Sequence, residues 1–231
     1  MQKESIYDLA YRGKTAEVRT LVQEDEKLKT AKDNNGRMLI HWAALGGHDE
    51  LVKFFLSLDV PVDPTDDRDR VFQTNMTPLI LAASAGREKV VNILITEGAN
   101  VNATTDEGHS ALQYAASKNW KSICVSLLNN DANINIVDKR SATPLHRAAS
   151  KGNLAIVQLL LDHGKGLNID QKDSYGNTAL HLACEENRAE EAKLLRKNGA
   201  NIYAKNKEGK TPLDFASPGL ARQLKEIANK Q

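Results

Sequence analysis

The sequence contains few aromatic residues, little cysteine and almost no net charge. Phenylalanine, tryptophan and tyrosine together make up 5% of its 231 residues, whereas one thick hydrophobic core of this size would normally use more large rings. The 31 lysines and arginines nearly cancel the 30 aspartates and glutamates. This balance argues against nucleic-acid binding, because nucleic-acid-binding proteins need a basic excess to neutralise phosphates.

Membrane spans, a secretory leader and a disulfide framework are also missing from the sequence. No apolar run approaches the ~20 residues of a membrane helix, and the first residues contain no apolar segment typical of a signal peptide. Two cysteines, Cys124 and Cys184, are too few for a disulfide framework, so we expect a reduced, intracellular protein. The hydrophobic fraction of 41% is nevertheless high enough for a folded chain.

One short pattern recurs along the whole chain. It reads Thr-Pro-Leu followed by an alanine-rich stretch, with three copies that keep Thr-Pro-Leu intact and four partial ones. With the threonine as the register, the copies start near residues 4, 38, 77, 110, 143, 178 and 211. This period of ~33 residues predicts a single domain of seven repeats that spans residues 1–231.

Each copy has the local signals of two short helices. Threonine is a good N-cap, and the proline beside it fits the first helical turn, where its missing N–H is not needed. A second helix with closely spaced aliphatic residues follows, and it stops at Gly98, Gly164 or Gly199 in the copies where the glycine is present. The first helix should end at a glycine or asparagine, as the C′ position prefers: Gly47, Gly86, Asn119, Gly152 and Asn187.

Three departures from the period mark special segments. About six extra residues after Asp63 predict a lengthened hairpin or loop within residues 63–75, and two extra residues surround Gly164. The first copy lacks a hairpin, and we expect the last copy to end in a polar helix from Leu220 to Lys230. Atypical ends of this kind are the caps that a stack of repeats needs for solubility.

The histidines are candidates for catalysis or metal binding. His41, His146 and His181 occupy the same place in three copies, tens of residues apart, so no pair has the i, i+4 spacing of a helical metal site. The sequence also lacks a nucleophile elbow, a phosphate-binding loop and a plausible carboxylate pair. We therefore expect structural histidines, no metal or other cofactor, and no enzymatic activity.

The repeated Thr-Pro-Leu-His pattern and its period resemble the ankyrin-repeat family. The resemblance implies an all-α solenoid of seven helix-turn-helix repeats joined by short β-hairpin turns. It also implies that the histidine of the pattern forms hydrogen bonds within and between repeats, and that the hairpin turns and first helices line a concave, partner-binding face. On that face we expect charges to segregate by repeat, with Lys139, Arg140 and Lys151 basic and Glu185 and Glu186 acidic.

Longer strings within residues 83–87, 114–119, 146–154 and 182–195 are similar to a narrower group, the ankyrin-repeat chaperones that assist assembly of the 26S proteasome regulatory particle. That resemblance implies a monomer in the cytoplasm and nucleus, which binds the C-terminal domain of a proteasomal regulatory ATPase subunit. It also implies a cyclin-dependent kinase, a retinoblastoma-type protein and a ubiquitin ligase as further partners. The residues carried over as partner contacts are Arg37, Trp42, Arg87, Lys118, Lys151, Glu185 and Glu186.

A second interpretation is a regulator or scaffold of cell-cycle or transcription proteins that uses the same face. Leu182, Cys184 and Glu186 form the Leu-x-Cys-x-Glu pattern that retinoblastoma-type pocket proteins recognise. The same residues belong to a first helix of the repeat, where Cys184 should face the packed layer. Docking of the motif as an extended segment would require that helix to unfold, so both interpretations of the motif stay open.

Overall fold

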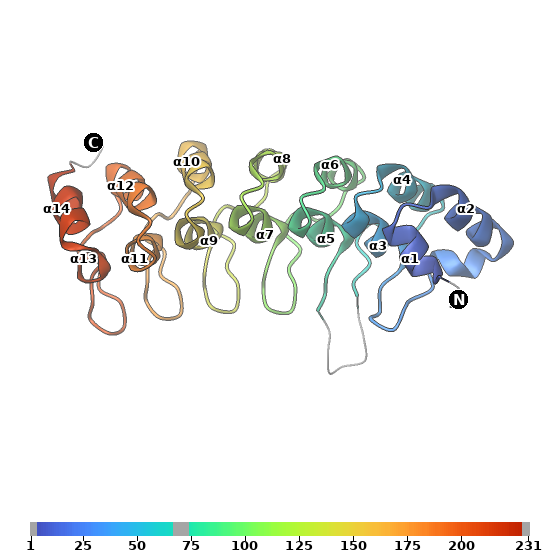
Figure 1. Ribbon diagram of the computed structural model, residues 1–231, viewed down its shortest axis with the longest axis horizontal. Helices are drawn as coiled ribbons and strands as arrows, with labels where there is room; N and C mark the ends of the chain where they lie inside the picture. Colours follow the sequence, from blue (N-terminus) through green and yellow to red (C-terminus); the bar gives the residue numbers. More distant parts are fainter. Residues whose placement is uncertain (1–3, 67–73, 228–231) are drawn as a thin grey trace. The chain divides into compact units, whose positions relative to one another are not determined.

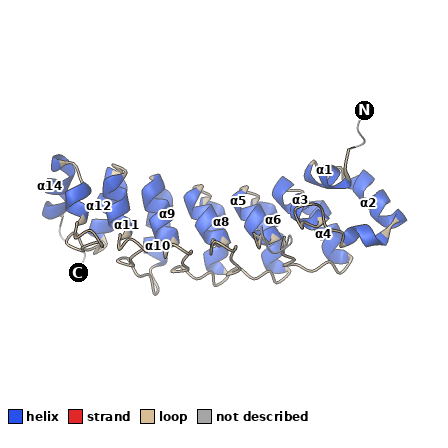
Figure 2. Ribbon diagram, turned by 90° about the horizontal axis from the view of Figure 1, so that it is seen from below, coloured by secondary structure: helices blue, strands red, loops and turns tan. Residues whose placement is uncertain are grey.

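The computed structural model describes residues 4–66 and 74–227, and these residues are almost entirely helices and turns (Figure 1). Within them no strand is present, and the single isolated antiparallel bridge joins Thr104 to Ser110 (Figure 2). No helix in the described part of the chain is long and apolar enough to cross a membrane. The all-α fold of helix-turn-helix repeats is therefore confirmed, and its hairpin turns are too short to form strands.

The helices form seven consecutive pairs, as the period predicts. The first helices of the pairs are α1 (Ile6–Tyr11), α3 (Leu39–Gly46), α5 (Pro78–Ser84), α7 (Ala111–Ser117), α9 (Pro144–Lys151), α11 (Ala179–Glu185) and α13 (Pro212–Phe215). The second helices are α2 (Thr15–Glu24), α4 (Asp49–Ser57), α6 (Glu88–Thr96), α8 (Lys121–Asn129), α10 (Leu154–His163), α12 (Ala189–Lys197) and α14 (Pro218–Glu226). A 3-10 turn, η1 (Glu26–Lys29), follows α2.

Threonine is the N-cap of α5, α9, α11 and α13, as expected, whereas Met38 stands at the N-cap of α3. The hydroxyl of Thr77 accepts a hydrogen bond from the N–H of Ile80 at 3.3 Å, and proline fills the first turn of α5, α9 and α13. The first copy differs by one residue, because Ser5 rather than residue 4 is the N-cap of α1. Ser5 and Asp8 form a reciprocal capping box there, which satisfies two backbone N–H groups at the start of the helix.

The residues expected to end the first helices all have positive φ. In this left-handed region glycine has no Cβ penalty and asparagine is tolerated. The second-helix stops Gly98, Gly164 and Gly199 behave in the same way, with φ of 87°, 54° and 95°. Both sets of predicted helix stops are thus confirmed. The first set comprises Gly47, Gly86, Asn119, Gly152 and Asn187, with φ of 88°, 72°, 63°, 74° and 54°.

The helices are grouped into two compact units. The N-terminal unit comprises residues 1–111 and 129–131, and the C-terminal unit comprises residues 112–128 and 132–231. Within the N-terminal unit, α3 packs against α1 and α5, and α4 packs against α6; within the C-terminal unit, α11 packs against α9 and α13, and α12 packs against α10 and α14. The single domain over residues 1–231 stays a prediction.

Small aliphatic side chains fill the layers between helices. Alanine, leucine, isoleucine and valine dominate the buried residues, and Phe55 is the one aromatic side chain in the hydrophobic core of the described residues. Thin layers of this kind need few large rings, which explains the low aromatic content. The buried polar side chains include His41, His146 and His181, each no more than 1% exposed.

The hairpin that follows Asp63 has an ordinary base. In a regular hairpin, the N–H of Asp138 donates to the carbonyl of Ala142, four residues later, at 3.1 Å. In the lengthened one, the N–H of Asp66 donates to the carbonyl of Met76, ten residues later, at 3.2 Å. The insertion is therefore confined to the segment between these two residues, of which 67–73 lie outside the described residues.

The predicted C-terminal helix is shifted. Ser217 caps α14, which therefore begins at Pro218, two residues before the predicted start at Leu220. The helix ends at Glu226 because Ile227 has an extended backbone, with ψ of 117°. Residues 228–230 of the prediction lie outside the described residues. The helix is polar on its outer side only, since Leu220 and Leu224 are buried.

Candidate functional site

A cleft of about 600 Å³ lies in the C-terminal unit, between the first helices α9, α11 and α13 and the hairpins that precede them. In Figure 1 these three hairpins extend from the same edge of the row of first helices. The hairpins contribute Arg140, Tyr175 and Lys207 to the lining, and the helices contribute Arg147, Leu182 and Glu185. The cleft thus combines cations, three carboxylates (Asp173, Glu185 and Glu208) and apolar surface.

The hairpins hold their shape through hydrogen bonds to their own backbone. In the middle hairpin, Asp173 Oδ1 accepts hydrogen bonds from the N–H groups of Tyr175 at 2.9 Å and Asn177 at 2.8 Å. The Oδ1 atoms of Asp138 and Asn206 accept hydrogen bonds from backbone N–H groups of their own turns in the same way. These local bonds fix the direction in which the residues at each tip leave the backbone.

Adjacent hairpins are also bonded to one another. The N–H of Ser174 donates to the carbonyl of Arg140 at 2.7 Å, and the N–H of Lys207 donates to the carbonyl of Tyr175 at 3.0 Å. We call the resulting line of Arg140, Tyr175 and Lys207 the tip row. All three side chains of the tip row are exposed.

Buried histidines connect each first helix to the next hairpin. His146 Nδ1 accepts from the backbone N–H of Thr143 at 3.1 Å, and its Nε2–H donates to the carbonyl of Asn177 at 3.0 Å. His181 repeats this arrangement toward the carbonyl of Lys210 at 3.2 Å. Burial lowers the pKa of both imidazoles, which keeps them neutral and able to accept at Nδ1.

This geometry gives the histidines a structural role. His41 forms the equivalent contacts in the N-terminal unit, where Nε2 lies 2.8 Å from the carbonyl of Pro64. These are the bonds within and between repeats that the family resemblance implies. Among the described residues, no group of three or more histidine, cysteine or acidic side chains is placed to hold a metal ion.

Arg147 forms one wall of the cleft and is anchored to a buried carboxylate. Its guanidinium pairs with Asp138, whose side chain is 1% exposed. Burial alone would raise the pKa of Asp138, but the hydrogen bond from Arg147 and those from the backbone N–H groups of Ala142 and Arg140 lower it overall. Asp138 therefore stays ionised, and Arg147 is held in place by it.

The remaining charges of the cleft are more accessible. Lys210 pairs with Glu208 at 2.9 Å, and this hydrogen bond, with a further contribution from Glu185, raises the pKa of Lys210. Among the described residues, Arg140, Lys207 and Glu185 have no ion-pair partner, and all three are exposed. Their charges are available to a bound partner.

The C-terminal ends of the first helices carry a second set of charges. Lys151 is the last residue of α9, where a cation is favourable because the helix dipole places negative partial charge there. Glu185 is the last residue of α11 and Glu186 is its C-cap, so two carboxylates lie at the same negative end. Both carboxylates therefore oppose the helix dipole and lack an ion-pair partner among the described residues, and their role as partner contacts stays a prediction.

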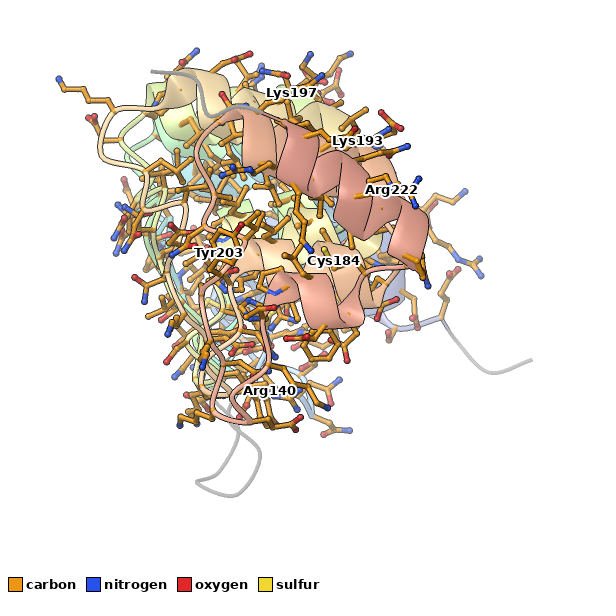
Figure 3. All side chains as sticks on the ribbon, turned by 90° about the vertical axis from the view of Figure 1, so that its left-hand side faces the viewer. Arg140, Cys184, Lys193, Lys197, Tyr203 and Arg222 are labelled. Atoms are coloured by element: carbon orange, nitrogen blue, oxygen red, sulfur yellow. The ribbon has the colours of Figure 1, made fainter. Side chains whose placement is uncertain are left out.

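The predicted contact residues divide between the two units. Lys118, Lys139, Arg140, Lys151, Glu185 and Glu186 lie in the C-terminal unit and are exposed. Figure 3 shows Arg140 on the hairpin side of this unit, whereas Lys193, Lys197 and Arg222 lie on the opposite side. Arg37, Trp42 and Arg87 lie in the N-terminal unit.

In the N-terminal unit the predicted contacts are engaged with their own chain. Arg37 pairs with Asp66 at 3.0 Å, lies over the ring of Trp42 and has a side chain only 20% exposed. The indole N–H of Trp42 donates to Asp33 at 2.9 Å. Arg87 donates from Nε to the carbonyl of Leu45 at 3.0 Å, at the end of α3. Their roles as partner contacts stay predictions.

The three residues of the Leu-x-Cys-x-Glu pattern differ in exposure, because they lie on different sides of the chain at the end of α11. Leu182 is half-buried and lines the cleft, whereas Cys184 is 0% exposed and Glu186 is exposed. Burial raises the pKa of the Cys184 thiol to about 12. The expectation that Cys184 faces the packed layer is confirmed, and use of the motif by a pocket protein stays a prediction.

Sequence reasoning missed two residues of the cleft, Arg147 and Phe215. Both occupy the fourth place after the N-cap of their helix, as Leu182 and Trp42 do in theirs. Trp42 was carried over from the resemblance as a contact in its own repeat alone. A comparison of the fourth place after the N-cap in every repeat would have identified Arg147 and Phe215 as well.

Comparison with known proteins agrees with this architecture. A family model described as ankyrin repeats (3 copies) matches residues 6–105, 97–173, 116–206 and 165–225. The solved ankyrin repeat domain of human ASB11 superposes with a TM-score of 0.83 at 25% identity and covers 99% of this chain and 100% of that domain. The ankyrin repeat domain of Bcl-3, with a TM-score of 0.80 at 23% identity over 96% of this chain and 98% of that domain, shows the same fold.

Among known sequences, the human 26S proteasome non-ATPase regulatory subunit 10, gankyrin, is 46% identical over 62 residues, which are 27% of this chain and 27% of that protein. The chicken nuclear factor NF-kappa-B p105 subunit is 29% identical over 216 residues, which are 92% of this chain and 22% of that protein. The matches span about a quarter of the length of these relatives. Since the family model covers nearly the whole sequence, the chain belongs to the ankyrin-repeat family, whose fold is a scaffold for protein–protein interaction.

Proposed function

We propose that this ankyrin-repeat interaction module is an assembly chaperone of the 26S proteasome regulatory particle. In this role it binds the C-terminal domain of a regulatory ATPase subunit through the cleft of the C-terminal unit. The observation that carries the proposal is the 46% identity to gankyrin over 62 residues. The charged cleft also supports the proposal, because it offers a surface to which a partner can bind. We also propose that the chain has no enzymatic activity of its own.

The cleft has the properties of a partner-binding surface. Its hairpins are fixed by internal hydrogen bonds, so little conformational entropy is lost when a partner binds. Arg140 and Lys207 on one side and Glu185 on the other give it two signs of charge, which set the register and the association rate of a complementary partner. Tyr175, at 61% exposure, offers an aromatic anchor between them.

Chaperoning follows from binding alone. A chain that binds the ATPase domain stabilises that assembly intermediate by an amount that depends on its concentration relative to Kd. A bound repeat stack would also block premature docking of the ATPase onto the proteolytic core. We propose a monomer in the cytoplasm and nucleus, which sedimentation equilibrium and imaging of a fluorescent fusion would test.

The direct test mixes the purified chain with the ATPase C-terminal domain and measures the complex by gel filtration. We expect a complex at micromolar concentration, and its absence would contradict the proposal. Reversing the acidic pair with Glu185→Lys and Glu186→Lys should slow association, as should Lys118→Glu with Lys151→Glu. Lys197→Glu, on the opposite side of the C-terminal unit, is the matched control and should bind as the parent does.

A second candidate function is regulation or scaffolding of cell-cycle or transcription proteins. The match to NF-kappa-B p105 over 92% of the chain favours it. Candidate partners are a cyclin-dependent kinase, a retinoblastoma-type protein and a ubiquitin ligase. Affinity capture from a lysate separates the two functions, because proteasomal ATPases should dominate in one case and be absent in the other. Full binding of a pocket protein by Cys184→Ala would exclude use of the Leu-x-Cys-x-Glu pattern.

A further inference from the structure

The tip row of the C-terminal unit presents two unpaired cations with an aromatic side chain between them. Arg140 and Lys207 are exposed and have no ion-pair partner among the described residues. Tyr175 lies between them in the row, because backbone hydrogen bonds join its hairpin to both neighbours. Two ion pairs lie nearby, Arg147 with Asp138 and Glu208 with Lys210. Among the described residues, the cleft carboxylates Asp173 and Glu185 have no ion-pair partner.

The spacing of the row is set by the packing of the first helices. Helices in contact lie ~8–10 Å apart, and α11 packs against both α9 and α13. Arg140 and Lys207 precede the two outer helices, but the hydrogen bonds through Ser174 and Tyr175 hold their backbones closer than two helix spacings, at most about 15 Å apart. An extended peptide rises ~3.3 Å per residue, and about four residues therefore span this distance.

The surface below the row is apolar at its middle. Leu182 and Phe215 are half-buried and line the same cleft as Tyr175. An apolar side chain at the centre of a bound segment would contact this surface, while side chains at its two ends reach the cations. Glu185 on the helix side is exposed and would repel an acidic residue at the centre.

We propose that the tip row recognises an extended acidic segment of a partner protein, in which two acidic residues four positions apart flank a central apolar residue. Recognition rests on the two exposed cations and on the pre-formed hairpins that hold them. This inference depends on the proposed function in that it names the kind of segment the same cleft binds. It does not depend on the ATPase being the protein that supplies the segment.

The probe is a fluorescent five-residue peptide with glutamate at its first and fifth positions, phenylalanine at the third, and serine and glycine at the other two. Its control has the same composition with the two glutamates adjacent at one end. Fluorescence anisotropy measures binding of both to the full chain. We expect the spaced peptide to bind at least about tenfold more tightly than the control, and to bind less tightly as salt is raised.

The double variant Arg140→Gln, Lys207→Gln should weaken binding of the spaced peptide at least about tenfold. Lys197→Gln, which removes an exposed lysine from the opposite side of the C-terminal unit (Figure 3), should leave it unchanged. Far-UV circular dichroism confirms that both variants fold, as expected for exposed side chains. Equal binding of the two peptides, no binding of either, or full binding by the double variant would overturn the inference.

The experiments distinguish failure of this inference from failure of the proposed function. If the ATPase domain binds the double variant as it binds the parent, and the spaced peptide does not bind, the inference fails and the proposed function stands. If the spaced peptide binds as expected and the ATPase domain does not bind the parent chain, the inference stands and the proposed function fails.

Discussion

Acidification should destabilise the N-terminal unit through the buried imidazole of His41. The side chain is 0% exposed, and its Nδ1 accepts a hydrogen bond from the backbone N–H of Met38 at 3.1 Å. On the other side of the ring, Nε2–H donates to the carbonyl of Pro64 at 2.8 Å. A proton added at Nδ1 would face the Met38 N–H, so the fold requires the neutral form.

The size of the effect follows from the pKa of His41. Burial, the largest influence, lowers this pKa from 6.5 to about 4, although nearby Asp66 opposes the shift. Between these two pH values the unfolded chain binds a proton that the folded chain does not, so the free energy of unfolding falls as pH falls. The stability is fully present above about pH 6.5, and the total loss by pH 4 is about 3 kcal/mol.

The indole of Trp42 lies in the N-terminal unit, one residue from His41, and can report this transition. The sequence has two tryptophans, so Trp120→Phe leaves Trp42 as the sole tryptophan. Urea unfolding followed by its fluorescence, repeated from pH 7.5 to pH 4.5, gives the free energy of unfolding at each pH. His41→Asn is the comparison, because its side-chain oxygen can still accept from Met38 but does not titrate.

We expect the parent to lose more stability between pH 6.5 and pH 4.5 than His41→Asn does, by about 2 to 3 kcal/mol. His41→Asn should be the less stable protein at pH 7.5, because the bond to Pro64 is lost. Carboxylates that titrate in this range contribute to both proteins and cancel in the comparison. Equal losses in the two proteins would refute the assignment of a neutral, structurally required His41.

Three further predictions concern the C-terminal unit. Gly176→Ala should lower the free energy of unfolding, measured with urea, by about 2–3 kcal/mol, because the new Cβ would lie 2.8 Å from the backbone of the next hairpin. Gly209 has a similar φ but no neighbouring atom within 4 Å of a new Cβ, so Gly209→Ala should lower it by only about 1 kcal/mol. Glu186→Lys should stabilise the unit by about 0.5 kcal/mol through the α11 dipole while weakening binding of the ATPase domain, and unchanged affinity would contradict a contact role. Arg147→Met should lower the free energy of unfolding by about 2 kcal/mol and raise the pKa of Asp138, which shifts the midpoint of acid unfolding to higher pH. An unchanged midpoint would show that the ion pair is not what lowers the pKa of Asp138.

Local signals predicted the fold well because repeat boundaries depend on short-range chemistry. A threonine that caps a helix and a glycine that ends one act within a few residues, so a pattern in the sequence is enough to place them. The first copy was displaced by one residue because Ser5 and Asp8 form a better cap than residue 4 does. Asp59 and Asp131 occupy the place of Gly98 with positive φ, and a search for glycine alone does not find them.

The candidate site was predicted less completely because it depends on contacts between repeats. The exposed cation Arg140 was predicted as a basic hairpin residue, since turns of the repeat are recognisable in sequence. The ion pair of Arg37 with Asp66 was not predictable, because it joins residues 29 apart in two successive hairpins, with α3 and α4 between them in the sequence. Periodicity identifies which residues share a position, but the partner of each charged side chain is decided by packing.

The central claim is that the cleft of the C-terminal unit binds the C-terminal domain of a proteasomal ATPase. Hydrogen exchange of the chain with and without that domain tests it most directly, because backbone amides in an interface become protected. We expect new protection in the hairpins 138–142, 173–177 and 206–210 and in α11, with none in α12. Binding that leaves these hairpins unprotected, or no binding at micromolar concentration, would contradict it.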